Sequence, residues 1–408
     1  MPTADEAAAL FNPFSPEFRA DPYPAYAAMR EAAAVLRTPI GATLVLRYEP
    51  VDRVLRSSAF RTPRGYRDAD DPAGPQRFDP NGALSLHRRH WILFQSGDAH
   101  ARLRKLVTKV FTPRAVRVLA PRIEEIVEGL LAPVLERGSM EVIGDFAYPL
   151  PATVICELLG IPEGDRELNR RAAAAIAPTL DPVVGDEQIA AAEEAMREWD
   201  AYIRSLLSER RKKPSDALLD AFLAVEEDGT GLSEDEIAAN ATFLFAAGHE
   251  TTTNLIGNGL LALIRHPDEL GALRADPGLI EGAIEELLRF DSPVQFTSRV
   301  PLERGDVEGE AVEPGVPVLL VLGSANHDPR RYDRPERLDV RRRDVKPLSF
   351  GGGPHFCIGA ALARLEAQIA FRKLLAHART IDLETDEPAW RATLNLRALE
   401  RLPVSISG

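Results

Sequence analysis

Helical periodicity dominates the chain from residue 99 to about residue 375, where apolar side chains recur every three or four positions. The clearest repeats cover residues 122–135, 150–159, 186–211 and 232–264. Alternation of apolar and polar residues, which is typical of strands, is confined to pieces near residues 35–37 and 42–47 and to the interval 293–322. The pattern therefore predicts a mainly α protein, a multihelical fold with small accessory β-sheets.

Neither an internal repeat nor a linker interrupts this pattern, so we expect a single domain over residues 1–408. Residues 61–95 are dense in Pro, Gly, Asp and Arg, and long irregular segments of this kind tend to be lids or binding loops. In chain order, the expected parts are a β-containing start (about 1–60), an access loop (about 61–95), a helical core (about 99–290), a strand and meander region (about 291–349), a glycine-rich loop with the last long helix (350–377), and terminal strands (378–408).

Charge and hydropathy predict the location of the protein and exclude some classes of partner. The 62 acidic and 49 basic residues give a net charge of −13, which disfavours binding to nucleic acid or to an anionic membrane. The first thirty residues lack the basic and apolar regions of a signal peptide, and we find no run of about 18 uncharged apolar residues. We therefore expect a cytoplasmic protein without a membrane partner.

The chain has two cysteines, too few for a structural zinc site or a disulfide framework. Cys156 lies on an apolar helix face, which predicts an inert buried thiol. Cys357 lies in SFGGGPHFCIGAALARLE, a glycine-rich loop that runs directly into an amphipathic helix over 358–377. A sulfur at a helix start is favoured as thiolate by the unpaired N–H groups and the helix dipole, so Cys357 is a candidate nucleophile, redox switch or metal ligand.

The neighbours of Cys357 favour a metal-ligand role. The local pattern suggests no Asn or Asp that would orient a base for a nucleophile. Gly351–Gly353 and Gly359 indicate that something large and flat approaches the backbone, a requirement that haem meets. A phosphate-binding loop is disfavoured because no Lys-Ser/Thr pair follows and the dinucleotide spacing is lacking.

Phe350, Gly353, Cys357 and Gly359 match the pattern F-x-x-G-x-x-x-C-x-G, and nearly the whole chain resembles the cytochrome P-450 family of haem-thiolate monooxygenases. The resemblance implies one catalytic domain with the multihelical cytochrome P-450 fold, in which 61–95 is the substrate-access loop. It also implies a haem b cofactor, iron protoporphyrin IX, with Cys357 as the metal ligand and Phe350 shielding the sulfur.

A polar cluster interrupts the helix expected over 232–264. By itself it could be a solvated face, or threonines bonded to their own helix carbonyls. Ala247, Gly248, Glu250 and Thr251 nevertheless resemble the family motif A/G-G-x-D/E-T, in which a distorted helix forms an oxygen-binding groove against the haem. The resemblance assigns hydrogen bonding at the oxygen site to Thr251 and the proton supply to Glu250. His249 occupies the variable position and is expected to point elsewhere.

Glu286 and Arg289 lie three residues apart on one helix face. An isolated pair of this kind is most simply a surface ion pair worth a few tenths of a kcal/mol. In this context the two residues resemble the structural E-x-x-R of the family, expected to pair with Arg337 of the meander. The resemblance also suggests four partners for the haem propionates: His100, Arg104, Arg299 and His355.

By the same resemblance, the substrate pocket draws on mostly apolar side chains of several segments, including the stretch 178–184. The residues named for it are Phe94, Phe243, Ala246, Ala247, Gln295, Phe296 and Thr297. Such a wall predicts a medium or large apolar substrate, such as a polyketide or terpenoid of secondary metabolism, together with O₂.

A local basic patch predicts the electron donor. Residues 99–123 contain no acid, and the patch consists of Arg102, Arg104, Lys105, Lys109, Arg114, Arg117 and Arg122. Such a surface suits an acidic ferredoxin that is supplied by an NAD(P)H-dependent ferredoxin reductase, and Arg364 and Arg372 are expected to extend it. Two alternatives remain open: a peroxygenase driven by hydrogen peroxide, and a haem-thiolate sensor without catalysis.

Overall fold

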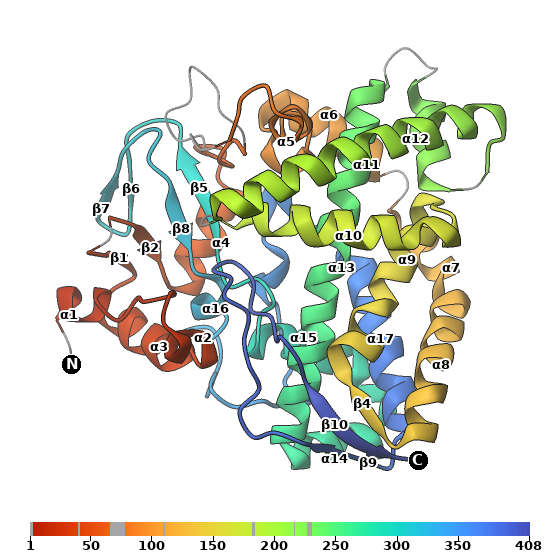
Figure 1. Ribbon diagram of the computed structural model, residues 1–408. Coiled ribbons are helices and arrows are strands. Elements are labelled where there is room, and N and C mark those ends of the chain that lie inside the picture. Colours follow the sequence, from red (N-terminus) through yellow and green to blue (C-terminus); the bar gives the residue numbers. More distant parts are fainter. Residues whose placement is uncertain are drawn as a thin grey trace. The chain divides into compact units, whose positions relative to one another are not determined.

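A computed structural model shows a mainly α chain with small sheets, which confirms the predicted fold class (Figure 1). It describes residues 3–39, 41–65, 78–108, 111–181, 184–215, 217–226 and 231–408. The chain divides into two compact units, the first of residues 1–60, 117–150 and 251–408 and the second of residues 61–116 and 151–250. The expectation of a single catalytic domain stays a prediction.

Small sheets in the first unit join segments that are distant in sequence. The largest has the order β1 (Val35–Arg37), β2 (Thr43–Val45), β8 (Val318–Leu320), β5 (Thr297–Pro301) and β3 (Phe60–Arg61), whose last residue opens the second unit. Strands β2 and β8 are parallel, whereas the pairs β1–β2 and β5–β8 are antiparallel. The short strands expected near 35–47 and within 293–322 are therefore present.

Two further sheets of the first unit are antiparallel. Strands β6 (Gly305–Val307) and β7 (Glu310–Val312) form a hairpin whose turn residues Glu308 and Gly309 both have positive φ, 53° and 88°. Such a turn matches the right-handed twist of the flanking strands. The terminal sheet has the order β4 (Ser139–Glu141), β10 (Pro403–Ser407), β9 (Thr380–Leu383).

Helices α8 (Ala120–Arg137) and α17 (Ala360–His377) pack side by side in the first unit (Figure 1). Ion pairs join them: Arg372 contacts Glu124 at 2.9 Å, and Lys373 contacts Glu128 at 2.9 Å. The other helices wholly in this unit are α1 (Ala4–Ala8), α2 (Pro16–Ala20), α3 (Tyr23–Ala32), α4 (Tyr48–Arg56), α14 (Pro267–Ala275), α15 (Ile280–Phe290) and α16 (Leu322–Ala325).

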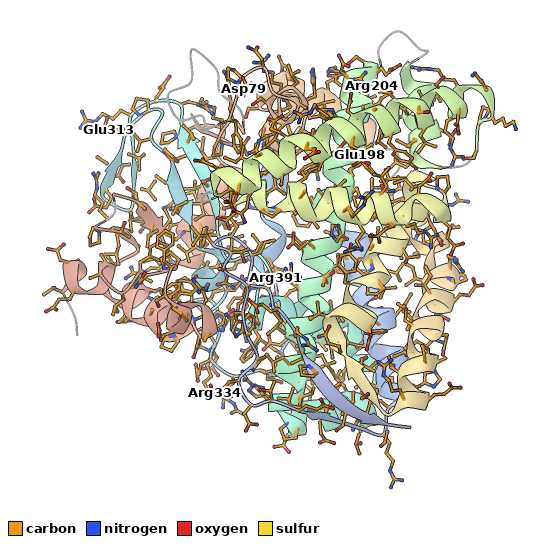
Figure 2. The ribbon with its side chains drawn as sticks, in the orientation of Figure 1. Asp79, Glu198, Arg204, Glu313, Arg334 and Arg391 are labelled. Carbon is orange, nitrogen blue, oxygen red and sulfur yellow. The ribbon has the colours of Figure 1, made fainter. Side chains whose placement is uncertain are left out.

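The second unit is helical, and its longest complete helix is α11 (Asp186–Lys212), which packs on α10 (Arg166–Ile176). Figure 2 labels two charged residues of α11, Glu198 and Arg204, and Arg204 pairs with Asp200 at 2.9 Å and Asp235 at 2.7 Å. The other helices of this unit are α5 (Ala83–Arg88), α6 (Gly97–Thr108) and α12 (Leu218–Glu226), whereas α7 (Pro113–Val118) and α9 (Pro149–Leu159) cross the unit boundaries.

Helix α13 (Glu234–Arg265) is the longest in the described chain, and the division between the units falls within it, after Glu250. A reciprocal pair caps its start, because the Glu236 N–H donates to the Ser233 hydroxyl at 3.2 Å and the Ser233 N–H donates to the Glu236 carboxylate at 2.9 Å. Most of its second half is buried. The sequence therefore places a polar cluster in the middle of a core helix.

One stretch, Val142–Leu159, is long and apolar enough to cross a membrane by length and composition. It is 56% buried, and it is divided between a π-helical segment (Val142–Ala147) and α9. It also carries Asp145 and Glu157, which pair with Arg137 and Arg166. These features are those of a core helix that packs inside a folded protein.

Candidate active site

The segment around Cys357 is a tight loop held by its own backbone. Short 3₁₀ turns cover Leu348–Phe350 and Gly353–His355, and α17 begins at Ala360. The Cys357 N–H donates to the Phe350 carbonyl at 3.0 Å, which closes the loop into a ring. The Cys357 side chain is exposed, so the loop presents the sulfur at its surface rather than within the core.

The two glycines of the sequence pattern, Gly353 and Gly359, have different surroundings. Gly353 has φ +64°, and a Cβ there would lie 2.5 Å from the Leu55 carbonyl oxygen, so both the backbone and the packing exclude a side chain. A Cβ at Gly359, by contrast, would meet nothing within 4 Å. The chain itself occupies the space beside Gly353, whereas the space beside Gly359 is open to a bound group.

Phe350 is covered by a cation from α17. The Arg364 guanidinium lies 4.5 Å from the centroid of the Phe350 ring and pairs with Glu285 of α15 at 2.9 Å. This contact combines a cation–π interaction with an ion pair and fixes the ring beside the cysteine loop. Arg364 is therefore half-buried and paired with an acid. Its positive charge contributes little to the basic surface that we expected it to extend.

Glu286 and Arg289 of α15 form a fully buried ion pair, with 0% of each side chain exposed. The Arg289 guanidinium donates to both carboxylate oxygens of Glu286, at 2.7 and 2.8 Å. Its remaining N–H groups donate to main-chain carbonyls of Asn326, Pro335 and Arg337. A buried arginine with this many partners organises the meander, as expected for a structural E-x-x-R.

The meander arginine that pairs with Glu286 is Arg342, at 3.1 Å, and the prediction of Arg337 is wrong in this respect. Arg337 contributes only its carbonyl, which accepts from Arg289 at 3.0 Å and from Arg342 at 3.2 Å, while the residue itself is exposed. Inside an irregular segment neither a helix nor a strand period fixes which side chain points inward, so sequence spacing could not distinguish the two arginines.

Helix α13 has an accessible stripe in its middle. Residues there that are half-buried or exposed are Phe243, Leu244, Ala247, Gly248, Glu250 and Thr251, whereas Ala246 and His249 are buried. Positions 243, 247 and 251 recur every four residues and therefore share one helix face. This face carries small side chains, one aromatic ring and the two residues of the predicted proton relay.

His249 turns away from that stripe, as expected for the variable position of the motif. It is 4% exposed, its Nδ1 is 2.8 Å from the Phe245 carbonyl, and its ring packs against Phe245 at 5.3 Å. The Trp199 ring stacks on the same phenylalanine at 5.7 Å. His249 is thus a core histidine of the second unit.

The four predicted propionate partners have different surroundings. His100 and Arg104 lie four apart on α6 in the second unit, with His100 4% exposed and Arg104 half-buried. Arg299 of β5 and His355 of the cysteine loop belong to the first unit, where Arg299 is 5% exposed and His355 is half-buried.

Arg299 is a buried cation without an acid. Its guanidinium donates to the Ser298 carbonyl at 2.9 Å and reaches the Thr297 hydroxyl at 3.5 Å, and within the described ranges it forms no salt bridge. Burial lowers its pKa to about 10, with no carboxylate to offset this effect. An uncompensated buried charge is costly, so this position suits a bound anion.

Two predicted pocket residues of the second unit, Phe94 and Phe243, belong to an aromatic cluster with Trp91. The Trp91 ring stacks on Phe94 at 5.8 Å and packs on Phe243 of α13 at 5.5 Å. The Asn240 side chain holds this loop, because it accepts from the Ile92 N–H at 2.9 Å and donates to the His90 carbonyl at 2.8 Å. Residues 66–77 of the access loop and residues 182–183 of the predicted pocket stretch lie outside the described residues.

Gln295 and Phe296 lie elsewhere. Phe296 belongs to the core cluster of the N-terminal helices, 6.3 Å from the Phe11 ring, and Gln295 donates to the Ser292 carbonyl at 2.8 Å. Their assignment to the substrate wall stays a prediction, and Thr297 is half-buried next to Arg299.

Comparison with known proteins assigns the family. The family model for cytochrome P450 matches residues 169–277 and 272–392. The chain is 40% identical over 398 residues to the cytochrome P450 monooxygenase PikC of Streptomyces venezuelae, covering 95% of this chain and 92% of PikC. It is 36% identical to the polyketide biosynthesis cytochrome P450 PksS of Bacillus subtilis, covering 98% and 99%. The crystal structure of P450BioI with an acyl carrier protein ligated to hexadec-9Z-enoic acid superposes with a TM-score of 0.89 at 36% identity, covering 96% of this chain and 100% of that one.

The chain belongs to the cytochrome P450 family. It is therefore a haem-iron oxidoreductase, a P450 monooxygenase that binds haem b. The residues present fit that group, because the first unit of this P450 offers an exposed thiol, open space beside Gly359 and the buried cation Arg299.

Replacing Arg299 with methionine tests this fit. We expect the affinity of the haem-free P450 for haem to fall about tenfold, the effect of losing one charge-assisted contact of roughly 1.4 kcal/mol. The stability of the haem-free protein should stay equal or rise, because a buried charge without an acid is removed. Haem titration and urea unfolding measure the two quantities.

The matched control is Arg30→Met, because Arg30 is also 5% exposed but the negative charge of Asp328 partly offsets the effect of burial on its pKa, and it donates to the Ser324 carbonyl and hydroxyl at 2.9 and 3.1 Å. Arg30→Met should destabilise the haem-free P450 and leave haem affinity unchanged. Equal haem affinity in Arg299→Met and in the unaltered protein would show that no anionic group of the cofactor uses this arginine.

Sequence reasoning missed Glu366 of α17. Its side chain is 2% exposed, and burial raises its pKa to about 8, which a hydrogen bond with Thr252 partly offsets. Both residues belong to the first unit, and Thr252 directly follows Thr251. The available signal was an acid within the apolar run of an amphipathic helix, ALARLEAQIAF.

The other cysteine behaves as predicted. Cys156 of α9 is 2% exposed, and burial raises its pKa to about 12, so it stays a protonated core thiol.

The basic patch is partly neutralised, because Arg102 pairs with Glu236 and Arg122 pairs with Glu125. Arg114 and Arg117 are exposed, and Lys109 lies outside the described residues.

Proposed function

We propose that this P450 inserts one oxygen atom of O₂ into a C–H bond or an alkene of a medium or large apolar substrate, with electrons from a ferredoxin. The observation that carries this proposal is the accessible stripe of α13. Phe243 and Ala247 offer an apolar surface on the face that continues to Thr251, so an apolar substrate and the proton relay would share one side of the helix.

The relatives support the substrate class. PksS is named for polyketide biosynthesis, and the P450BioI structure holds a hexadec-9Z-enoic acid on its carrier protein. Both names describe large, mainly apolar organic groups. We infer a polyketide, terpenoid or similar natural product as the substrate here, and a cytoplasmic location for the reaction.

Haem, when bound, supplies the activation of O₂ and the transfer of one oxygen atom to carbon. The chain would hold it through the Cys357 sulfur, with Phe350 and Arg364 packed behind the loop. Arg299, His100, Arg104 and His355 would hold its propionates as donors of charge-assisted hydrogen bonds. The aromatic cluster around Trp91 would exclude water from an apolar substrate.

Thr251 and Glu250 would supply protons. Cleavage of O₂ consumes two protons, and a hydroxyl can donate one only if a neighbouring ionisable group replaces it. Glu250 is half-buried, so its carboxyl can exchange protons with solvent. The Thr251 hydroxyl would then hold the proton next to the oxygen site. Glu366 of α17 is hydrogen-bonded to Thr252, the neighbour of Thr251 on α13, and it is not part of this assignment.

The electron donor is inferred from the exposed basic residues. Arg114 and Arg117 of α7 stay exposed, and a small acidic ferredoxin would be attracted to them without needing a large contact area. A reductase that oxidises NAD(P)H would then supply the ferredoxin. Charge reversal at both arginines should slow reduction in a way that disappears at high salt.

A spectral screen tests the proposed function. Apolar macrolides, terpenoids and fatty acids are titrated into the ferric protein, and a high-spin shift identifies ligands that displace water from the haem. Product formation is then compared between two supplies, NADPH with ferredoxin and its reductase, or hydrogen peroxide alone. Faster turnover with peroxide would establish a peroxygenase, and absence of any oxidised product from tight-binding ligands would establish a sensor.

Thr251→Ala separates oxygen cleavage from electron uptake. We expect the variant to consume NADPH at a rate close to that of the unaltered protein but to lose about 10²-fold in product, because the positioned proton donor is gone. The diverted electrons should appear as hydrogen peroxide, measured by a peroxidase assay. Thr253→Ala is the control, since Thr253 is 3% exposed and lies off the accessible stripe. Unchanged coupling in Thr251→Ala would remove this residue from the relay.

A further inference from the structure

Asn326, which caps the end of α16, anchors the segment before the cysteine loop through its side chain. Its Oδ1 accepts from the Leu348 N–H at 2.8 Å, and its Nδ2 donates to the hydroxyls of Ser292 at 2.7 Å and Ser349 at 3.0 Å. Asn326 and Ser292 are 0% exposed, and Ser349 is 8% exposed. All four residues belong to the first unit.

The chemistry of this network requires an amide at position 326. Both serine hydroxyls lie within hydrogen-bond distance of the Leu288 carbonyl, Ser292 at 2.9 Å and Ser349 at 2.7 Å. Each hydroxyl has one proton, and if both donate to that carbonyl, their lone pairs face the two N–H groups of Asn326. The Leu348 N–H fixes the orientation of the amide, because only its oxygen can accept there.

The network fixes the position of the backbone on which Cys357 depends. Asn326 holds the N–H of Leu348, and the Leu348 carbonyl accepts from the Gly351 N–H at 2.8 Å. Phe350 lies between Leu348 and Gly351 in the sequence, and its carbonyl accepts from the Cys357 N–H at 3.0 Å. These three hydrogen bonds, together with the backbone of residues 348–351, therefore connect the buried amide to the cysteine.

The same residue also meets the E-x-x-R pair. The Arg289 guanidinium donates to the Asn326 carbonyl at 3.1 Å, so the main chain of Asn326 is held on one side and its side chain holds the loop on the other. We propose that Asn326 is a positioning residue that connects the Glu286–Arg289 pair to the cysteine loop and keeps the Cys357 sulfur on the haem iron. This inference rests on the proposed role of Cys357 as the iron ligand.

Asn326→Asp is the sharpest test, because aspartate has the same shape but replaces the two N–H donors with an oxygen. The holoprotein is reduced and exposed to carbon monoxide, and the spectrum is followed as the thiolate-ligated form converts to the form without thiolate. We expect this conversion to be about tenfold faster in Asn326→Asp, the change that corresponds to about 1.4 kcal/mol at the loop.

Asn258→Asp is the matched control. Asn258 of α13 is 1% exposed and donates to the Arg397 carbonyl at 2.8 Å, so the substitution buries the same charge away from the cysteine loop. It should lower the thermal midpoint of the holoprotein by a similar amount and leave the conversion rate unchanged. Equal conversion rates in the two variants would overturn the proposal, because Asn326 would then be an ordinary core residue.

Ser349→Ala provides a milder test if Asn326→Asp does not fold. It removes one hydroxyl of the network, and we expect a conversion about threefold faster. Ser324→Ala removes another buried hydroxyl, which donates to the Leu46 carbonyl, and should have no effect on the conversion. No acceleration in Ser349→Ala would also count against the proposal. A wild-type protein without a thiolate-type spectrum would instead refute Cys357 as the ligand.

Discussion

Cys357→Ala should abolish the thiolate-type spectrum of the reduced carbon monoxide complex and reduce monooxygenase turnover by more than about 100-fold. Loss of an outer partner of a metal ligand costs roughly 10–100-fold, and here the proposed ligand itself is removed. The thiolate donates electron density that favours O–O cleavage, and alanine has no lone pair to replace it. The measurements are the carbon monoxide difference spectrum and product formation with the best ligand of the screen.

Cys156→Ala is the control that the chain itself provides. Cys156 is 2% exposed and its pKa is raised to about 12, so its loss removes a small core group and no thiolate. The Cys156→Ala variant should keep the carbon monoxide spectrum and the turnover rate of the unaltered protein, and its free energy of unfolding should fall by about 1 kcal/mol. A Cys357→Ala protein with an unchanged spectrum would mean that another group holds the iron.

Glu286→Ala should destabilise the protein by about 3–5 kcal/mol, a large part of the 5–15 kcal/mol that typically separates folded from unfolded states. The carboxylate neutralises Arg289, which is 0% exposed, pairs with Arg342, and accepts the Asp339 N–H at 3.0 Å. Removing it leaves a buried guanidinium without its acid and an unpaired backbone donor. Urea unfolding of the holoprotein, or the yield of haem-loaded protein, measures the loss.

Glu285→Ala is the neighbouring control. Glu285 pairs with Arg364 but is 22% exposed, so water can replace much of that interaction and the expected cost is about 0–1 kcal/mol. Glu286→Gln keeps the shape and one acceptor, and it should fall between the two. Equal stability of Glu285→Ala and Glu286→Ala would show that the buried pair is not the structural element that its geometry indicates.

Periodicity predicted the helical elements well because long amphipathic or apolar segments leave a repeating signal. The expected helices over 186–211 and 232–264 correspond to Asp186–Lys212 and Glu234–Arg265. Glycine placement was a weaker guide, since Gly353 was interpreted as room for a large flat group but is required by its positive φ and by its contact with the Leu55 carbonyl. Local rules thus sufficed where a single segment determines the structure.

Contacts between distant segments could not be predicted in the same way. Arg342 replaces Arg337 beside Glu286 because the meander has no regular period. Phe296 packs in the core cluster of the N-terminal helices, and this contact joins residues that lie far apart in the sequence. Asn326, in SANHDP, gave no signal of its own: its importance comes from Ser292 and Ser349, which lie 34 and 23 residues away in the sequence.

The buried carboxyl of Glu366 has a consequence for handling the enzyme. In an unfolded chain this group ionises near pH 4.5, whereas the folded protein keeps it protonated up to about pH 8. The native state therefore binds one more proton than the denatured state between those values, and resistance to unfolding declines as the buffer is made more alkaline across that interval, levelling off above it. Purification and storage at mildly acidic pH should accordingly preserve the enzyme longer than alkaline buffers do.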